Sequence, residues 1–207
     1  MILVDVGNTR AHVWKDGTIE HMKIDEAIAR YRAHRVHYIN VNLDHHEALS
    51  ALANWENLSE RIEIQGAYEG MGIDRKALCL SHEEGIFVDA GSAITVDRVE
   101  DGRYAGGFLL PGLQAYRRAF AGISPVLDHP ITPIDSVIDA GNLPRDTAHG
   151  VRYGVIGSIV AAVEKIQGSF PVYITGGDGA MLAKQIDGSL YDDALVFLGM
   201  RKAVRSI

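Results

Sequence analysis

The strongest constraint on the fold is a strand-and-turn motif that occurs twice. The segment ILVDVGNT at residues 2–9 returns as IFVDAGSA at residues 86–93, with Ile, Val, Asp and Gly at matching positions. In each copy an apolar run ends at an Asp and enters a glycine turn, which is typical of a strand that turns back on itself. An Asp-Gly pair (Asp16-Gly17, Asp101-Gly102) follows the next strand-like run. This pair favours a type I′ turn, so each half is predicted to open with a three-stranded antiparallel meander.

The pattern after each meander extends the repeat. In the first half it predicts a helix after Asp25, a strand at 36–41, a helix from Asp44 to about Glu56 and a strand at 61–64, which gives the order βββαβαβ. In the second half it predicts a helix at 143–166, strands at 172–175 and 194–197, and a terminal helix. We therefore expect an α/β protein of two duplicated units, with lobes at 1–83 and 84–207. Chance sharing of common turn formers is the alternative.

The two Asp-x-Gly turns predict a phosphate-binding site. Glycine lets the backbone approach a ligand, and the following N–H groups and hydroxyls donate to phosphate oxygens. Two such turns facing across a cleft would hold a triphosphate from both sides, with a cation between the carboxylates and the phosphate oxygens. The downstream strand-to-helix turn Thr175-Gly176-Gly177 supports this interpretation, whereas neither a P-loop nor a complete dinucleotide fingerprint is present.

Composition narrows the function classes. With 20 Lys plus Arg against 27 Asp plus Glu, the formal charge is −7, which argues against a nucleic-acid partner. The single cysteine, Cys79, excludes a disulfide within the chain and is expected to be buried on a helix. The N-terminal run lacks a signal-peptide pattern, and no stretch is apolar enough to cross a membrane. A cytoplasmic location without a membrane partner is the expectation.

The motifs together resemble one known family. DVGNTR (5–10), GMGIDR (70–75), DAGSAITVD (89–97), GGFLLPG (106–112) and ITGGDG (174–179) are similar to the ordered motifs of type III pantothenate kinases. These kinases belong to the actin-like (ribonuclease H-like) acetate and sugar kinase superfamily, so the resemblance implies two such lobes with a central cleft. It also implies ATP-dependent phosphorylation of pantothenate to 4′-phosphopantothenate, the first step of coenzyme A biosynthesis. The implied cofactors are Mg²⁺ and a monovalent cation (K⁺ or NH₄⁺), and the implied assembly is a homodimer.

The resemblance assigns roles to individual residues. It makes Asp74 the proton acceptor and Asp89 the ligand of the monovalent cation. The implied ATP contacts are Asp5, Val6, Gly7, Asn8, Thr9, Arg10, Ser92, Gly176 and Gly177. The implied pantothenate contacts are Tyr68, Gly72, Ile73, Asp74, Arg75 and Thr147. Ser92 stands where the family usually has Thr.

Several alternatives stay open at this point. Asp89 competes with Asp74 for the role of base. Arg75 suits the carboxylate of pantothenate because its planar fork matches a carboxylate, but a surface ion pair with Asp74 or Glu69 is the alternative. The histidines near expected element ends are interpreted as solvated side chains rather than metal ligands (His34, His37, His45 and His46). For the whole chain, the alternatives are a non-catalytic regulatory protein of the same fold and another small-molecule kinase of the superfamily.

Overall fold

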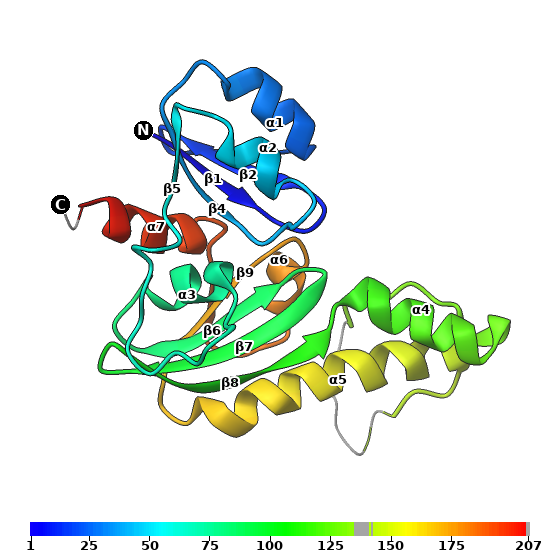
Figure 1. The fold of residues 1–207 in the computed structure, drawn as a ribbon. Coiled ribbons are helices and arrows are strands. Elements are labelled where there is room, and N and C mark those ends of the chain that lie inside the picture. The colour runs from blue at the N-terminus through cyan, green and yellow to red at the C-terminus, as the bar shows by residue number, and fades with distance from the viewer. Residues whose placement is uncertain (135–140, 142, 206–207) are drawn as a thin grey trace. The chain divides into compact units, whose positions relative to one another are not determined.

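The chain folds into two compact units (Figure 1). The structure, a computed structural model, describes residues 1–134, 141 and 143–205. Unit 1 contains Met1–Glu83, the stretch Glu100–Tyr104 and the chain from Asp193 onward. Unit 2 contains Glu84–Val99 and the described part of Ala105–Asp192. The first change of unit lies at the predicted lobe boundary, but the C-terminal segment is part of unit 1; the lobe limits 1–83 and 84–207 stay a prediction.

Unit 1 is built on a five-stranded mixed sheet in the order β3-β2-β1-β4-β5. The central strand β1 is antiparallel to β2 and parallel to β4, and β4 is parallel to β5. The strands are β1 (Ile2–Val6), β2 (Ala11–Lys15), β3 (Thr18–Met22), β4 (Val36–Asn40) and β5 (Trp55–Asn57).

Unit 2 repeats this topology in the order β8-β7-β6-β9-β10. Strand β6 takes the place of β1, with an antiparallel neighbour β7 and a parallel neighbour β9. The strands are β6 (Gly85–Ala90), β7 (Ala93–Glu100), β8 (Arg103–Pro111), β9 (Val172–Thr175) and β10 (Ser189–Tyr191). The predicted α/β fold of two units with the same sheet topology is confirmed.

Both predicted Asp-Gly hairpin turns are present. Asp16 and Gly17 have φ angles of 50° and 90°, and Asp101 and Gly102 have 48° and 71°. A type I′ turn needs positive φ at both central residues, and Asp tolerates this conformation better than most residues that carry a Cβ. The two turns fix the register of β2 against β3 and of β7 against β8.

The apolar core of unit 1 lies between its sheet and helices α1 (Ile24–Tyr31) and α2 (His46–Ser50). Alternate residues of β1 (Ile2, Val4 and Val6) enter one buried cluster with α1 and α2. Because side chains alternate along a strand, Leu3 and Asp5 belong to the opposite face. On that side helix α7 (Leu195–Arg205) contacts β1, and helix α3 (Ile73–Cys79) contacts β4 and α7.

In unit 2 the long helix α5 (Thr147–Gln167) covers one face of the sheet. Its buried residues Val155, Ile156, Ile159 and Val163 pack in one cluster with β6 and β9. The other helical segments are α4 (Leu113–Ile123), the 3₁₀ turn Pro125–Leu127 and α6 (Gly179–Leu182). No helix in the described ranges is both long and apolar enough to cross a membrane.

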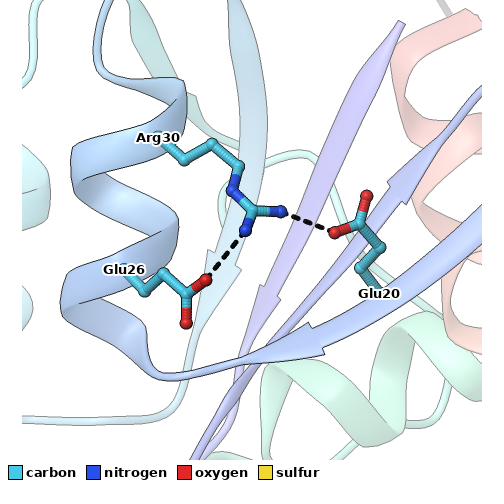
Figure 2. Close-up of polar contacts among 3 residues, drawn as sticks. All are labelled: Glu20, Glu26 and Arg30. Atoms are coloured by element: carbon cyan, nitrogen blue, oxygen red, sulfur yellow. Dashed lines mark hydrogen bonds and ion pairs between the residues drawn. The ribbon is translucent and has the colours of Figure 1, made fainter.

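An ion-pair network joins α1 to the edge strand β3 (Figure 2). Arg30 donates to Glu20 on β3 at 2.6 Å and to Glu26, one helical turn earlier, at 2.8 Å. All three side chains are about half exposed, so water screens both ion pairs and their contribution to stability is small. The two pairs link α1 to the edge strand β3.

Two predicted strands are wrong. Residues 61–64 form a turn and coil, because the N–H groups of Arg61 and Ile62 donate to the carbonyl of Leu58. The apolar alternation there reflects burial of Leu58, Ile62 and Ile64 without strand pairing. The second strand, expected at 194–197, is part of helix α7. Six of the eleven residues of α7 are buried (Leu195, Val196, Phe197, Gly199, Met200 and Ala203).

Gly199 allows α7 to pack closely on α3. A Cβ at this position would overlap the carbonyl oxygen of Ala77. We predict that Gly199→Ala lowers the free energy of unfolding by about 1–3 kcal/mol, because backbone must move to admit the methyl group. Urea denaturation measures this change.

The matched control is Gly150→Ala on the exposed side of α5, where a Cβ would meet nothing within 4 Å. There the substitution is expected to stabilise by up to about 1 kcal/mol, since Ala favours the helix over Gly. Equal effects at the two positions would contradict the close packing of α7 on α3.

Candidate functional site

The first Asp-x-Gly turn joins β1 to β2 in unit 1. Asp5, near the end of β1, is half-buried and lies opposite His12 on β2 and beside Ile39 on β4. The N–H of Gly7 donates to the carbonyl of Arg10 at 3.0 Å and closes the turn. Asn8, Thr9 and Arg10 are exposed at its tip. The turn thus presents hydroxyl, amide and guanidinium groups next to a carboxylate.

A buried asparagine that follows the neighbouring strand β4 holds this turn. Asn42 donates from Nδ2 to the carbonyl of Asn8 at 3.0 Å, and its own N–H donates to Oδ1 of Asn40 at 2.9 Å. The N–H of Val41 also donates to the carbonyl of Val6. Sequence reasoning missed Asn42. The available signal was its place after β4, because polar residues at the carboxyl ends of parallel strands often serve a site.

The second Asp-x-Gly turn joins β6 to β7 in unit 2. Asp89 is half-buried and lies beside Thr95 on β7 and Thr175 on β9. The N–H of Gly91 donates to the carbonyl of Ala93 at 3.1 Å, and Ser92 is exposed. The two predicted turns therefore lie at equivalent places in the two sheets, but the first closes from Gly7 to Arg10 and the second, one residue shorter, from Gly91 to Ala93.

Gly176 brings the end of β9 against Asp89. Its φ is +90°, and a Cβ there would lie 2.5 Å from Oδ1 of Asp89 and 2.6 Å from the carbonyl oxygen of Ala90. The N–H of Asp178 also donates to that carbonyl, and burial raises the pKa of the Asp178 carboxyl. Gly112 similarly sits where a Cβ would be 2.5 Å from the carbonyl oxygen of Ser92. Three backbone segments thus meet around the second turn.

Oxygen atoms gather beside Asp89. Thr95 and Thr175 are 8% and 4% exposed. Within the part of the chain that the structure describes, the Thr95 hydroxyl has no hydrogen-bond partner. Hydroxyl, carboxylate and carbonyl oxygens are the ligands that hard cations prefer. The donors around Asp89 therefore fit a cation.

The Gly72–Arg75 segment begins helix α3. Asp74 is in its first turn, and its Oδ1 accepts a hydrogen bond from the N–H of Arg75 at 2.8 Å. A Cβ on Gly72 would lie 2.5 Å from the same Oδ1. The glycine therefore leaves the space that the carboxylate of Asp74 occupies, while Ile73 starts the helix.

Arg75 is buried, with 6% of its surface exposed, so the predicted alternative of a surface ion pair is wrong. Its Nη1 donates to the hydroxyl of Tyr68 at 2.6 Å and its Nη2 to the hydroxyl of Tyr104 at 3.3 Å. Tyr68 is half exposed, at 47%. Tyr104, which sequence reasoning missed, comes from the stretch 100–104 of unit 1. The two hydroxyls fix the plane of the guanidinium.

Thr147 is the first residue of α5 in unit 2 and is exposed. The helix begins there, later than the predicted residue 143, because the side chain of Asp146 accepts a hydrogen bond from the N–H of His149 at 2.9 Å. Hydrogen bonds from His149 hold the pKa of Asp146 below its usual value. The cap makes Thr147 the first residue of α5 and so fixes the position of its hydroxyl.

The predicted residues thus fall into one set in each unit. Unit 1 contains the turn from Asp5 to Arg10 and the segment from Tyr68 to Arg75. Unit 2 contains Asp89, Ser92, Thr147 and the Gly176-Gly177 pair. Their roles stay predictions. Cys79 is buried in α3, as expected.

Comparison with known proteins decides the family. The profile of type III pantothenate kinases matches residues 55–168. A type III pantothenate kinase of Helicobacter hepaticus is 38% identical over 205 residues, which cover 99% of this chain and 98% of the relative. One from Campylobacter hominis is 37% identical over 207 residues, covering 100% and 98%. The chain belongs to the type III pantothenate kinase family. It is therefore a phosphotransferase that acts on pantothenate.

Solved structures support the same fold. A Campylobacter jejuni protein described as a Baf family transcriptional activator superposes with a TM-score of 0.87 at 33% identity, covering 100% of this chain and 98% of that one. A 2-dehydro-3-deoxygalactonokinase protein from Sinorhizobium meliloti superposes with a TM-score of 0.57 at 12% identity, over 100% and 96%. At that identity the likeness concerns the fold alone.

The contact between Gly176 and Asp89 gives a direct test of the packing around the second Asp-x-Gly turn of this kinase. We predict that Gly176→Ala lowers the free energy of unfolding by about 1–3 kcal/mol, because the methyl group meets Asp89 and the backbone has positive φ. The neighbouring variant Gly177→Ala meets nothing within 4 Å and should stay within about 0.5 kcal/mol of wild type. Chemical denaturation of both variants measures the difference, and similar losses in both would argue against the close approach.

Proposed function

We propose that this type III pantothenate kinase transfers the γ-phosphoryl group of ATP to the primary alcohol of pantothenate, with Asp74 as the proton acceptor. The observation that carries the proposal is the fixed carboxylate of Asp74 in the first turn of α3, inside the Gly72–Arg75 segment. Phosphoryl transfer needs alignment of the reactants and charge neutralisation more than covalent chemistry from the protein. The product is 4′-phosphopantothenate, and the reaction is the first step of coenzyme A biosynthesis.

The turn from Asp5 to Arg10 is the proposed phosphate-binding element of unit 1. Its exposed tip offers the hydroxyl of Thr9, the amide of Asn8 and the guanidinium of Arg10 to phosphate oxygens. Asn42 keeps the turn in shape through the carbonyl of Asn8. In unit 2 we assign further ATP contacts to Ser92 and to the backbone of Gly176 and Gly177.

Asp74 is suited to act as the base because its carboxylate is both held and accessible. One oxygen accepts the N–H of Arg75, which orients the group, and the residue is only half-buried. A carboxylate within hydrogen-bond reach of the alcohol orients the hydroxyl and takes its proton, which is typically worth about 10²–10⁴-fold in rate. Asp89, the alternative base, is assigned to the cation instead.

Arg75 is the proposed partner of the pantothenate carboxylate. Tyr68 and Tyr104 hold its guanidinium in one plane, and a planar fork matches a carboxylate with two parallel hydrogen bonds. Tyr68 is exposed enough to touch the substrate as well. In unit 2, the hydroxyl of Thr147 is a further proposed substrate contact.

Two cations complete the proposal. A monovalent cation, K⁺ or NH₄⁺, fits the oxygen donors at Asp89, where the buried Thr95 hydroxyl adds a further oxygen. Mg²⁺, when bound with ATP, neutralises the phosphate charge. Asp5 is the residue of unit 1 best placed to lie near that charge, since it borders the proposed phosphate-binding turn.

Exposed apolar side chains support a homodimer. Of the eleven residues of α4 only Leu113 is buried. Ile123 is 74% exposed, and Val126 and Leu109 nearby in the sequence are 70% and 57% exposed. Large apolar side chains exposed on neighbouring segments favour an interaction site, and we propose a second copy of the chain as the partner. The cytoplasm is the proposed location, because the reaction consumes ATP.

The test of this function is ADP release in the presence of ATP and pantothenate, with and without K⁺ or NH₄⁺. Release that needs pantothenate and is stimulated by the cation supports the proposal. ATP hydrolysis without pantothenate would favour another enzyme of the superfamily. No turnover under any condition would favour the non-catalytic alternative, in which the fold serves regulation.

Asp74→Asn tests the base. We predict a fall in kcat of about 10²–10⁴-fold with the fold retained, because the amide oxygen still accepts the N–H of Arg75 while the base is lost. The control is Asp44→Asn at an exposed site in unit 1, which should leave kcat unchanged. Wild-type kcat in Asp74→Asn would transfer the role of base to Asp89.

Ile123→Asp tests the dimer. A carboxylate at the centre of an apolar contact is strongly disfavoured, so we predict that the wild type sediments as a dimer and the variant as a monomer. Leu43→Asp is the control, since Leu43 is 88% exposed in unit 1. A monomeric wild type, or an equal effect of the two substitutions, would contradict the proposed surface.

A further inference from the structure

Two histidines face each other on neighbouring strands of unit 1. His12 on β2 lies directly opposite His21 on β3. Their Nδ1 atoms are 2.6 Å apart, with the ring centroids 4.7 Å apart and the planes at 78°. His12 is half-buried and His21 is exposed on the edge strand of the sheet. The pair is therefore reachable from solvent, and its two Nδ1 atoms point at each other.

The geometry means that the two nitrogens share one proton at most. At 2.6 Å one Nδ1 donates and the other accepts, since two N–H groups cannot face each other at this distance. Burial, with the nearby positive groups His21 and Arg10, also lowers the pKa of His12 to about 4. His12 is thus neutral at pH 7, which is the form of imidazole that binds a metal.

The same arrangement is close to that of a metal chelate. Two nitrogens on one ion lie about 2.9–3.4 Å apart when each bond is about 2.0–2.1 Å and the angle is between square-planar and tetrahedral. The rings of His12 and His21 need to separate by less than about 1 Å to reach this spacing. Because His21 is exposed on an edge strand, its ring can move that far without disturbing the core.

A carboxylate lies in the same row of the sheet. Asp5 pairs with His12, and His12 pairs with His21, so all three side chains project from one face. The negative charge of Asp5 favours a cation nearby, and the positive charge of Arg10 opposes it. Among residues 1–134, 141 and 143–205 no group of three or more histidine, cysteine, aspartate or glutamate side chains is arranged as a metal site, so water would complete the shell.

We propose that His12 and His21 form a two-imidazole site for a divalent transition-metal ion of the Zn²⁺ or Ni²⁺ class. Imidazole selects these ions over Mg²⁺ and Ca²⁺, which prefer oxygen. Affinity is moderate, because the protein supplies two ligands rather than the four of a structural zinc site. A bound ion adds positive charge one strand away from Asp5 and so beside the turn that follows it.

The test is calorimetric titration of Zn²⁺ and Ni²⁺ into the whole nucleotide-free protein, in millimolar Mg²⁺. The wild type should bind one equivalent, and His21→Gln should weaken that binding at least about tenfold, or ~1.4 kcal/mol. The matched control His46→Gln, an exposed histidine of α2 in the same unit, should bind as the wild type does. A thermal scan checks that both variants keep the fold, as their exposure predicts.

A second readout identifies the ligands. With Cu²⁺ as the probe, electron paramagnetic resonance of the wild type should show hyperfine coupling to two imidazole nitrogens, and that of His21→Gln to one. Unchanged affinity in His21→Gln, an equal loss in His46→Gln, or a wild-type spectrum without two nitrogens would each overturn the proposal. None of these measurements depends on kinase activity, so their failure is distinct from failure of the proposed function.

Discussion

Both candidate sites depend on a close contact between a carboxylate and a glycine, where no other residue would fit. Asp89 has Gly176 beside it, and Asp74 has Gly72; in each case a methyl group would lie 2.5 Å from the carboxylate oxygen. The first glycine also needs its positive φ, whereas the second needs only the space. A charged oxygen held this closely has little freedom to rotate. The carboxylates are therefore oriented before any ligand arrives, which is how a protein lowers the entropy cost of alignment.

The sheets supply the frame for this orientation. In each unit a central strand runs antiparallel to one neighbour and parallel to the other, so a hairpin turn and the ends of parallel strands meet at one edge. The Asp of the turn is then flanked by residues from two further strands. In unit 1 these include Asn42 after β4, and in unit 2 Thr175 and Gly176 at the end of β9. Membership of the kinase family accords with this use of the edge for phosphate chemistry.

Local chemistry explains what could be predicted from the sequence. The Asp-Gly hairpins and the repeated strand follow from turn preferences and from alternation over a few residues, and the structure confirms them. The motif residues also fall at strand ends and at a helix start, where the resemblance put them. Their roles stay predictions.

Long-range packing explains what could not be predicted. Residues 61–64 alternate like a strand, but Leu58 closes a turn there and burial alone produces the pattern. From the sequence alone, Arg75 could form a surface ion pair with Asp74 or Glu69. In the structure it is buried and donates to the hydroxyl of Tyr104, which belongs to a hairpin far along the chain. Asn42 offers only its place after β4 as a signal, since its partner is the carbonyl of Asn8 in the turn after β1. Each failure involves a contact between segments far apart in the chain.

Because α7 belongs to unit 1 but follows unit 2 in the chain, it affects the order in which the two units can finish folding during synthesis. Its buried face (Val196, Phe197 and Met200 among others) packs on a unit whose sheet precedes unit 2 in the chain. Domains usually fold as units while the nascent chain grows, the N-terminal one first. Here unit 1 lacks one wall of its core until α7 has been synthesised, whereas unit 2, which lies between the segments of unit 1, already has all its strands by then. A stalled or prematurely terminated product would therefore expose apolar surface on its oldest part, which makes it a natural substrate for chaperones and proteases.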